Sequence, residues 1–441
     1  MLLASPWVWE GLCWRVCMKT VTVGLLGCGT VGEGILNLLA AERGEIADRT
    51  GVNIMVKRAL VRRKEAKRGA PTDGIEFTTK LEKIIDDPEI DVVVELIGGT
   101  DIALRGIEGA LKRGKHVVTA NKAIISQYGD RVIKLAARHR CGLAYEGAVS
   151  ASIPILQSLE HGLAGEKFDL VAGILNGTTN VILSRMDADR AEFADALKYA
   201  QDAGFAEADP TLDISGQDTA HKLSILVRKA FGVSVQPKGI PVQGVTDVGK
   251  DDIEHARQFG YRFKLIGMAK VTPLGLDVRV HPMLLPARHP LASVNEEFNA
   301  IYLEGRGVGP MIFYGRGAGS LPTARAVLGD LVKVASNDGS LVPRINTGDR
   351  VMPLAPSGKA DLMYYFRVTF EDQPHVLATV TKILDECKVE VHRIHALGER
   401  RGTIVMLTHP AEERNMRRAI DRMNRLKYMI EPARLFPMME T

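Results

Sequence analysis

Apolar and polar positions follow two different patterns along this chain. Between residues 19 and about 150, continuous apolar runs such as VTVGLL (21–26) and DVVVELI (91–97) alternate with segments whose apolar residues recur at helical spacing. Buried strands that alternate with helices are typical of a parallel sheet covered on both faces. The pattern therefore predicts an α/β domain over residues 19–150.

The second pattern begins near residue 151 and indicates an α+β domain that extends to about residue 340. Helical spacing (153–164, 179–186, 190–202, 215–231, 251–259) gives way to alternating strand patterns and one closing helix (263–272, 276–282, 299–305, 309–314; helix 323–335). Prolines and glycines in 341–360 predict a linker. Residues 361–441 then show the order strand, helix, strand, strand, helix, strand, which predicts a ferredoxin-like unit.

Composition narrows the class of protein. A chain of 441 residues with 46% hydrophobic and 25% charged residues is expected to form two or three globular domains. Its net charge of +4 is small and its basic residues are interleaved with acids, which argues against nucleic-acid binding. No apolar run is long enough to span a membrane, and the five cysteines lack framework spacing, so we expect a cytoplasmic protein with reduced thiols.

The first residues differ from the rest of the chain. All three tryptophans and two of the five cysteines lie within residues 1–17, and Met18 directly precedes the first predicted strand. We hypothesise that residues 1–18 are an extension that is disordered or is not translated, with synthesis starting at Met18.

A glycine-rich turn follows the first strand. Gly27, Gly29 and Gly32 form G-x-G-x-x-G, and Thr30 and Val31 open the next helix. In this position the glycines permit a tight turn, close approach of a pyrophosphate, and close helix–strand packing. The turn therefore predicts a Rossmann dinucleotide site; a glycine-rich packing turn is the alternative.

The ends of other predicted strands suggest the rest of that site. The second strand ends in Val61-Arg62-Arg63-Lys64, and a cationic end such as Arg62 favours the 2′-phosphate of NADP(H) over NAD(H), unless these side chains simply face solvent. Thr100 and Lys122 follow later strands and are expected to line the nicotinamide side, although Lys122 could instead be an exposed loop lysine.

An acidic segment with one lysine stands out in the second domain. Glu207, Asp209, Asp213, Asp218 and Lys222 lie within 207–222, and a helix is predicted over 215–230. Asp218 and Lys222 are four residues apart and share one face of that helix. A solvated surface ion pair is the ordinary interpretation of such a pair, and a proton-handling site is the other.

Together these motifs resemble one enzyme family, homoserine dehydrogenase, in the form with a C-terminal ACT-type regulatory domain. The matching segments occur in the family's order between residues 24 and 327: GLLGCGTVGEGI, ELIGGT, VTANKA, IPIL, GILNGTTN, AGFAEADPTLDISGQDTAHKL and GRGAGSLPTARAV. The resemblance implies NAD(P)-dependent interconversion of L-homoserine and L-aspartate 4-semialdehyde in the biosynthesis of threonine, methionine and isoleucine. It also implies a homo-oligomer.

The resemblance assigns roles residue by residue. It implies that Lys222 is the acid/base group, that Glu207 and Asp218 bind substrate, and that Gly204 and Gly319 contact the cofactor. Thr100 and Lys122 align with residues near the nicotinamide. A monovalent cation, usually Na⁺, is implied on the backbone carbonyls of Glu146, Val149, Ala151 and Ile153, although Ala151-Ser152 stands where the family often has two glycines.

The residue types suit this chemistry. Oxidation of a primary alcohol needs a group that takes the hydroxyl proton, and a lysine can do so if burial lowers its pKa, an effect that Asp218 opposes. Carboxylates suit the substrate's ammonium group. Residues 176–179 (NGTT) could donate to its carboxylate or could form only a helix N-cap, and Asp213 is expected to support the site rather than to bind substrate.

The sequence leaves three further alternatives open. The ACT-type unit has Asp372-Gln373-Pro374-His375 where the family shows D-x-P-G, so it either binds a threonine effector or serves only for dimerisation. A thioester-forming semialdehyde dehydrogenase would need an activated cysteine, and neither Cys28 nor Cys141 has a suitable neighbouring histidine motif. A catalytically silent ACT-domain amino-acid sensor is the alternative from another class.

Overall fold

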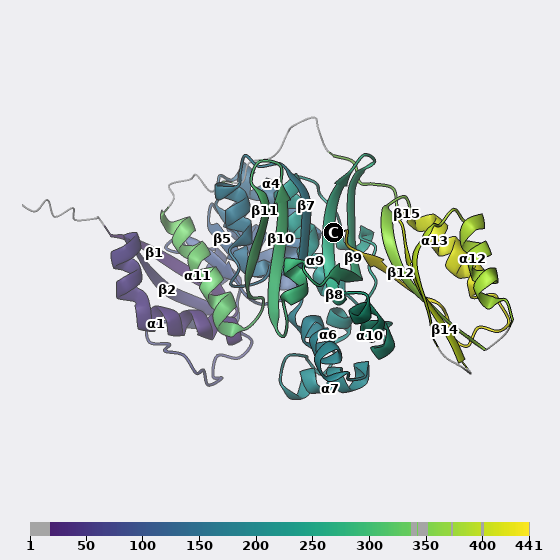
Figure 1. Ribbon diagram of the computed structural model, residues 1–441. Helices are drawn as coiled ribbons and strands as arrows, with labels where there is room; N and C mark the ends of the chain where they lie inside the picture. Colours follow the sequence, from purple (N-terminus) through teal and green to yellow (C-terminus); the bar gives the residue numbers. More distant parts are fainter. Residues whose placement is uncertain (1–17, 337–341, 343–351, 372–373, 398–400, 441) are drawn as a thin grey trace, which may run out of the picture.

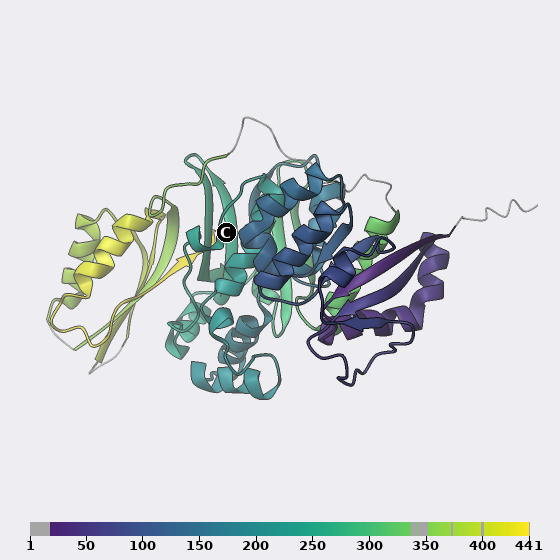
Figure 2. The ribbon, with the colours of Figure 1, turned by 180° about the vertical axis from the view of Figure 1, so that it is seen from behind.

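The computed structural model of this chain describes residues 18–336, 342, 352–371, 374–397 and 401–440. Three units lie in a row, with the N-terminal unit at one end and the C-terminal unit at the other (Figures 1 and 2). Residues 1–17, half of the predicted linker (341 and 343–351) and the Asp372-Gln373 pair lie outside the described residues, as does the hypothesis on the start of the chain. Within the described segments, no helix is both long and apolar enough to cross a membrane.

The first unit contains the parallel sheet that the apolar runs predict. Its strands lie in the order β3-β2-β1-β4-β5-β6, and every pair is parallel. This doubly wound order reverses between β1 and β4, which is where such sheets bind dinucleotides. The elements are β1 (Lys19–Leu26), α1 (Thr30–Thr50), β2 (Val52–Leu60), β3 (Glu76–Thr78), α2 (Glu82–Ile85), β4 (Val92–Glu95), α3 (Asp101–Lys112), β5 (His116–Thr119), α4 (Lys122–Arg138) and β6 (Leu143–Ala144).

The central unit is an antiparallel sheet with helices on one face. Its strands lie in the order β11-β10-β7-β8-β9, and α9 packs against β7, β8 and also α4 of the first unit. The elements are α5 (Ile155–Gln157), β7 (Phe168–Ile174), α6 (Gly177–Asp189), α7 (Phe193–Asp202), α8 (Thr211–Ile214), α9 (Gln217–Phe231), α10 (Lys250–Gln258), β8 (Tyr261–Thr272), β9 (Gly275–Pro286), β10 (Phe298–Gly305) and β11 (Gly309–Arg316).

The sequence pattern does not predict strand β7, because this strand is buried on both faces. Val171 and Ala172 have no exposed surface and Ile174 only 1%. A strand buried on both faces lacks the alternation that identifies a half-buried strand. Helix α9 was easier to predict because its buried residues Leu223, Leu226 and Val227 recur at helical spacing.

The order of elements in the sequence predicts that helix α11 (Ser320–Ser336) closes the central unit. In the structure this helix instead packs on α1 of the first unit. Ala324, Val327 and Leu331 are fully buried in the core that also contains β1 and α1 residues. The apolar face of this helix therefore completes the core of the first unit, although it lies far away in the sequence. In Figure 1 it lies beside β1 and β2.

The C-terminal unit has a four-stranded arm in the order β16-β12-β14-β13, with α12 and α13 beside it (Figure 1). Its elements are β12 (Asp361–Glu371), α12 (Val376–Glu386), β13 (Val391–Leu397), β14 (Arg401–Thr408), β15 (Ala411–Glu412), α13 (Glu413–Met423) and β16 (Arg434–Met438). The sequence pattern predicts the last strand of this unit at 428–436, whereas the strand begins later, at Arg434.

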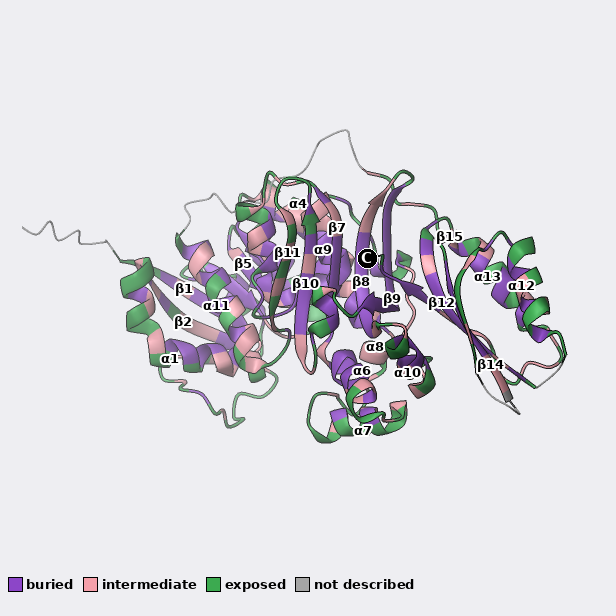
Figure 3. Ribbon diagram, viewed as in Figure 1, coloured by how far each residue is buried: buried purple, intermediate pink, exposed green. Residues whose placement is uncertain are grey.

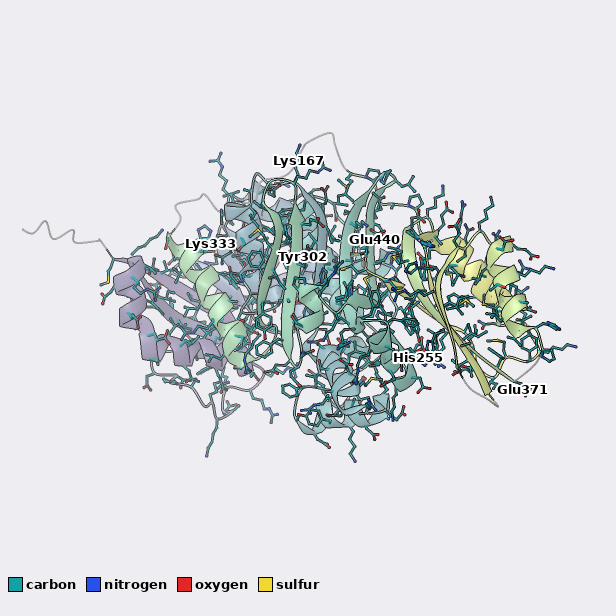
Figure 4. All side chains as sticks on the ribbon, in the orientation of Figure 1. Lys167, His255, Tyr302, Lys333, Glu371 and Glu440 are labelled. Atoms are coloured by element: carbon teal, nitrogen blue, oxygen red, sulfur yellow. The ribbon has the colours of Figure 1, made fainter. Side chains whose placement is uncertain are left out.

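The predicted linker at 341–360 indicates that the C-terminal unit is a separate domain. In the structure, however, this unit shares a sheet with the central unit. Strand β16 pairs with β9 through Met438 and Leu284, so one mixed sheet runs through both units. Across the junction, the Tyr365 hydroxyl donates to Asp252 of α10 at 2.9 Å, and Nδ1 of His255 lies 3.4 Å from the same hydroxyl. Figure 4 labels His255 near the C-terminal unit. Buried residues continue from the central sheet into β12 (Figure 3).

Candidate functional site

The glycine turn after β1 leaves open space beside the start of α1. Gly27 has φ +101°, and a Cβ at Gly32 would lie 2.9 Å from the Gly27 carbonyl oxygen, so both glycines are required by the turn itself. A Cβ at Gly29 would meet nothing within 4 Å. No side chain caps the N-terminus of α1. The turn thus offers an uncapped helix N-terminus beside free space, which fits a pyrophosphate.

A second glycine segment lies beside this turn. Gly319 has φ +118° and precedes α11, and the Ser320 hydroxyl donates to the Thr30 carbonyl oxygen at 2.8 Å. Val31 follows at the first turn of α1 and is half-buried. The structure therefore brings Gly319 next to Thr30, although they are 289 residues apart in the sequence.

The loop after β2 is organised by an arginine that the sequence analysis missed. Arg68 donates to the carbonyl oxygens of Arg63, Lys64 and Ala66 at 2.9, 3.1 and 2.8 Å, and its guanidinium lies 3.9 Å from the centre of the Phe77 ring. Arg62 is exposed at the end of the same strand. The loop is thus folded back on itself, with Arg62 facing outward.

A buried carboxylate ties together the ends of β4 and β5. Glu95 is fully buried and accepts from the Thr119 hydroxyl at 2.6 Å and from the Ile97 amide at 2.8 Å. Burial raises the pKa of Glu95. Asn121 donates to the Gly99 carbonyl at 2.8 Å and caps α4 through the Ile124 amide. In the sequence, the signal for this network is Glu95 itself, because an acidic residue is uncommon in an otherwise apolar buried strand.

Through that network Thr100 and Lys122 are held at neighbouring strand ends. Thr100 precedes α3 and Lys122 is the first residue of α4. The Lys122 ammonium lies 2.5 Å from Oδ1 of Asp218, which lies in the first turn of α9. From the sequence, Lys122 is expected in the nicotinamide half of the site and Asp218 in the substrate half. They lie in contact because α4 packs against α9.

Asp218 and Lys222 are both buried. They therefore do not form the solvated surface ion pair that is the ordinary interpretation of their spacing. Nζ of Lys222 lies 2.8 Å from Oδ2 of Asp218 and donates to the Leu175 carbonyl oxygen at 2.7 Å. Exposed fractions are 4% for the side chain of Asp218 and 10% for that of Lys222. Burial alone would raise the pKa of Asp218, but the ammonium groups of Lys222 and Lys122 hold it below its usual range.

Asn176 positions the carboxylates of this cluster. Its Nδ2 donates to Oδ1 of Asp213 at 2.7 Å and to Oδ2 of Asp218 at 2.9 Å, while its Oδ1 accepts from the Thr179 amide and caps α6. The N-cap expected for the NGTT segment is confirmed. The hydroxyls of Thr178 and Thr179 donate to Phe205 and Asn176, so they are already engaged within the protein.

Glu207 and Gly204 lie on the loop that closes toward this cluster. Both are exposed, and Gly204 has φ +77° at the end of α7. Partial burial acts to lower the pKa of Lys122, but Asp218, and then the charges of Asp213 and Glu207, raise it. Glu207 therefore lies close enough to act electrostatically on the cluster, and its carboxylate is not buried against it.

We expect Asn176→Ala to destabilise the protein by about 2–4 kcal/mol, because it removes a helix cap and leaves buried carboxylate oxygens with fewer donors. Urea unfolding followed by circular dichroism measures the change. Asn37→Ala, at an exposed position of α1, is the matched control and is expected within about 0.5 kcal/mol of the parent. Equal stabilities of the two variants would contradict the role of Asn176.

The segment 146–153, where the family resemblance implies a monovalent cation, has an unusual backbone conformation. Ser150 and Ala151 have φ of +50° and +36°, in the left-handed region that non-glycine residues rarely adopt. The Glu146 and Ile153 carbonyls accept backbone bonds from Val149 and Ile155, whereas no described residue donates to the carbonyls of Val149 and Ala151. The Glu146 carboxylate accepts from the amides of Leu156 and Gln157, both at 2.8 Å.

The chain is similar to proteins of known family over nearly its whole length. Residues 154–332 match the family described as homoserine dehydrogenase, and residues 27–146 match the NAD-binding domain of that family. It is 36% identical to "Homoserine dehydrogenase" of Bacillus subtilis over 420 residues, which is 94% of this chain and 97% of that protein. The corresponding protein of Pseudomonas aeruginosa is 38% identical, over 94% and 98% of the two chains.

Solved structures show the same similarity. A homoserine dehydrogenase from Thiobacillus denitrificans has a TM-score of 0.90 and 39% identity, covering 96% of this chain and 99% of that one. A hyperthermophilic archaeal homoserine dehydrogenase in complex with NADPH has a TM-score of 0.61 and 25% identity, covering 71% of this chain and 97% of that one.

Proposed function

This chain belongs to the homoserine dehydrogenase family, and from that membership we propose that its buried Asp218–Lys222 pair handles the substrate proton. The enzyme is an NAD(P)-dependent oxidoreductase of amino-acid biosynthesis that interconverts L-homoserine and L-aspartate 4-semialdehyde. The observation that supports the proposal is the burial of Lys222 against Asp218 at the point where α9, α4 and the end of β7 meet.

The bound nicotinamide supplies the hydride acceptor, and the chain must move the proton. The Lys222 ammonium has three hydrogens, and Asp218 and the Leu175 carbonyl accept two of them. The remaining position can face the substrate oxygen, where neutral lysine would take the hydroxyl proton and the ammonium would return it. Asp218 and Leu175 hold the Nζ atom in place for this transfer.

Substrate binding is proposed to use the carboxylates that surround the pair. Oδ2 of Asp218 is occupied by Lys222 and Asn176, while Oδ1 contacts Lys122 only. A substrate ammonium would therefore approach Oδ1 of Asp218 and the exposed carboxylate of Glu207. Lys122, whose side chain is 45% exposed, is then placed between the substrate and the nicotinamide end of the crevice at Thr100.

A thioester mechanism lacks support in the site. Cys28 lies inside the phosphate turn and Cys141 is buried before β6, and burial raises the pKa of both thiols. A raised pKa disfavours the thiolate that such a mechanism requires. The alternative of a catalytically silent sensor is not favoured by the family membership.

We propose NADP(H) as the preferred cofactor, because Arg62 is exposed at the end of β2 and a relative of this family binds NADPH. Arg62→Ala is then expected to raise the KM for NADP⁺ about tenfold, through loss of one charged contact with the 2′-phosphate. The KM for NAD⁺ is expected to stay within about twofold. Initial rates measured with both cofactors test this, and an equal effect on both would argue against the assignment.

A monovalent cation on the 146–153 segment is also proposed. The left-handed backbone at Ser150 and Ala151 and the two carbonyls without a described donor fit a carbonyl-lined site. Such a cation would fix the segment that connects the dinucleotide-binding unit to the central unit. This proposal can be tested without an activity assay, by comparing the unfolding temperature in Na⁺ with that in tetramethylammonium. We expect a lower unfolding temperature in tetramethylammonium.

The C-terminal unit is proposed to be an ACT-type regulatory unit that takes a threonine effector in a homo-oligomer. His375 has φ +66° before α12, which is the left-handed position where the family pattern has glycine. The turn therefore keeps the glycine-like backbone while adding a side chain. Inhibition by threonine would support effector binding, and a lack of inhibition would favour a dimerisation unit.

The direct test of the proposed function is homoserine-dependent reduction of NADP⁺ and NAD⁺ by the purified full chain. We expect activity with L-homoserine that is lost when Lys222 is replaced. Turnover of L-homoserine at the same rate without Lys222 would leave the family membership intact and refute the role of the pair.

A further inference from the structure

Helix α4 of the first unit packs against α9 of the central unit, and polar side chains connect the two helices at several points (Figure 1). One of these is the contact between Lys122 and Asp218 in the candidate site. In another, Oγ of Ser126 on α4 lies 2.6 Å from Nδ1 of His221 on α9. Neither Ser126 nor His221 has a role in the proton transfer or substrate binding proposed above, although their contact lies beside the residues that do.

The Ser126–His221 contact is adjacent to the Lys122–Asp218 contact on both helices. Ser126 follows Lys122 by four residues on α4, and His221 follows Asp218 by three residues on α9. Residues at these spacings share one face of a helix, so the two contacts lie one turn apart on the same interface. Ser126 is fully buried, and the other described bond of its hydroxyl is to a carbonyl of its own helix. The bond to His221 therefore ties the side chain of Ser126 across the interface to α9.

The imidazole of His221 is a neutral link between the two helices. Burial lowers the pKa of His221; the charge of Asp218 acts to raise it, and that of Lys122 lowers it further. Because its pKa lies below the usual value, the ring is uncharged at neutral pH. A neutral imidazole and a hydroxyl form a hydrogen bond that needs no charge on either side. A neutral amide in the same place should therefore be able to form this bond as well.

A separate contact anchors the same two helices without His221. Nη1 of Arg228 on α9 donates to the Ile125 carbonyl oxygen at 2.9 Å, and its Nε lies 3.1 Å from Oδ1 of Asp130. The approach is close, because a Cβ at Gly129 would lie 2.6 Å from Nη1 of Arg228. The packing of α4 on α9 thus has its own anchor. Loss of the bond at His221 should loosen the end of the interface that contains Lys122 and should not separate the helices.

We propose that His221 is a positioning residue that holds Lys122 against Asp218 by fixing the start of α4 on α9. This inference rests on the proposed place of Lys122 between the substrate and the nicotinamide. The nicotinamide is expected on the first unit, whereas the acid/base pair belongs to the central unit, so their alignment depends on how α4 lies on α9. A displacement of about 1 Å can cost about a hundredfold in rate. The substrate ammonium would still find the carboxylates of Asp218 and Glu207, so His221 acts on kcat more than on KM.

Steady-state kinetics of two variants at this position test the proposal in the full chain. His221→Leu loses the bond to Ser126, and we expect kcat for homoserine oxidation to fall about tenfold while KM stays within about twofold. The amide of asparagine lies as many bonds from Cα as Nδ1 of histidine does, so His221→Asn is expected to restore kcat to within about threefold of the parent. In a Lys122→Ala background, His221→Leu is expected to change kcat by less than about twofold, because the group that it positions is absent.

Arg228→Leu is the control for loss of stability at the same interface. It is expected to lower the midpoint of urea unfolding at least as much as His221→Leu does, while kcat stays within about twofold of the parent. An equal loss of kcat in His221→Leu and His221→Asn would overturn the proposal. So would a loss as large in Arg228→Leu, or one that persists in the Lys122→Ala background. None of these variants replaces Lys222, so a failure of its proton-transfer role would leave the comparison among them intact.

Discussion

Replacing Lys222 with alanine is expected to lower kcat for homoserine oxidation by about 10²–10⁴-fold, the usual contribution of a general acid or base. The physical reason is that the Nζ atom is held by Asp218 and the Leu175 carbonyl in a buried position, where water cannot readily replace it as a proton acceptor. Steady-state kinetics with saturating NADP⁺ and homoserine measure the loss. The affinity for NADP⁺ is expected to stay close to that of the parent, because the glycine-rich turn proposed to hold the phosphates lies between β1 and α1, away from Lys222 on α9.

Lys229→Ala provides the matched control on the same helix. Lys229 pairs with Glu160 at 3.0 Å and has no contact with Asp218 among the described residues. Its replacement removes a lysine from α9 but should change kcat by less than about twofold. If Lys222→Ala loses no more activity than Lys229→Ala, the proton-transfer role is wrong.

The second large effect is expected from Gly29→Ala, which should weaken binding of NADP⁺ by about tenfold to a hundredfold. A Cβ at this position meets nothing within 4 Å of the protein, so the free protein should fold with nearly unchanged stability. The added methyl group instead occupies the space beside the uncapped start of α1, where we propose that the pyrophosphate approaches the backbone. Fluorescence titration of NADPH measures the affinity.

Gly44→Ala, also on α1, is the control for adding a methyl group to the same helix. Its Cβ would likewise meet nothing within 4 Å, and a glycine replaced by alanine inside a helix is expected to stabilise it by about 1 kcal/mol. Cofactor affinity should not change. Tight cofactor binding by Gly29→Ala would place the pyrophosphate away from this turn.

The features that the sequence predicts well depend on local patterns. The continuous apolar runs predict the parallel sheet of the first unit, and the strand–turn–helix context of Gly27, Gly29 and Gly32 predicts its glycine-rich turn. The spacing of Leu223, Leu226 and Val227 predicts α9. Each of these signals lies within about twenty residues, so neighbouring residues are sufficient to identify it.

The features that the sequence missed depend on which distant elements meet. Helix α11 has an apolar face whatever it packs on, and only the fold shows that this face meets α1. Likewise, the 2.5 Å contact between Lys122 and Asp218 exists because α4 and α9 pack together. The pairing of Met438 with Leu284, which joins the C-terminal unit to the central sheet, also has no local sequence signal.

Chemical rescue is the sharpest test of whether Lys222 transfers the substrate proton. Small primary amines such as methylamine are added to Lys222→Ala, and kcat/KM for homoserine is measured against the concentration of free amine. We expect the rate of the variant to rise in proportion to free amine, while the parent enzyme does not respond. A folded variant that binds NADPH normally and shows no stimulation by any small amine would contradict it.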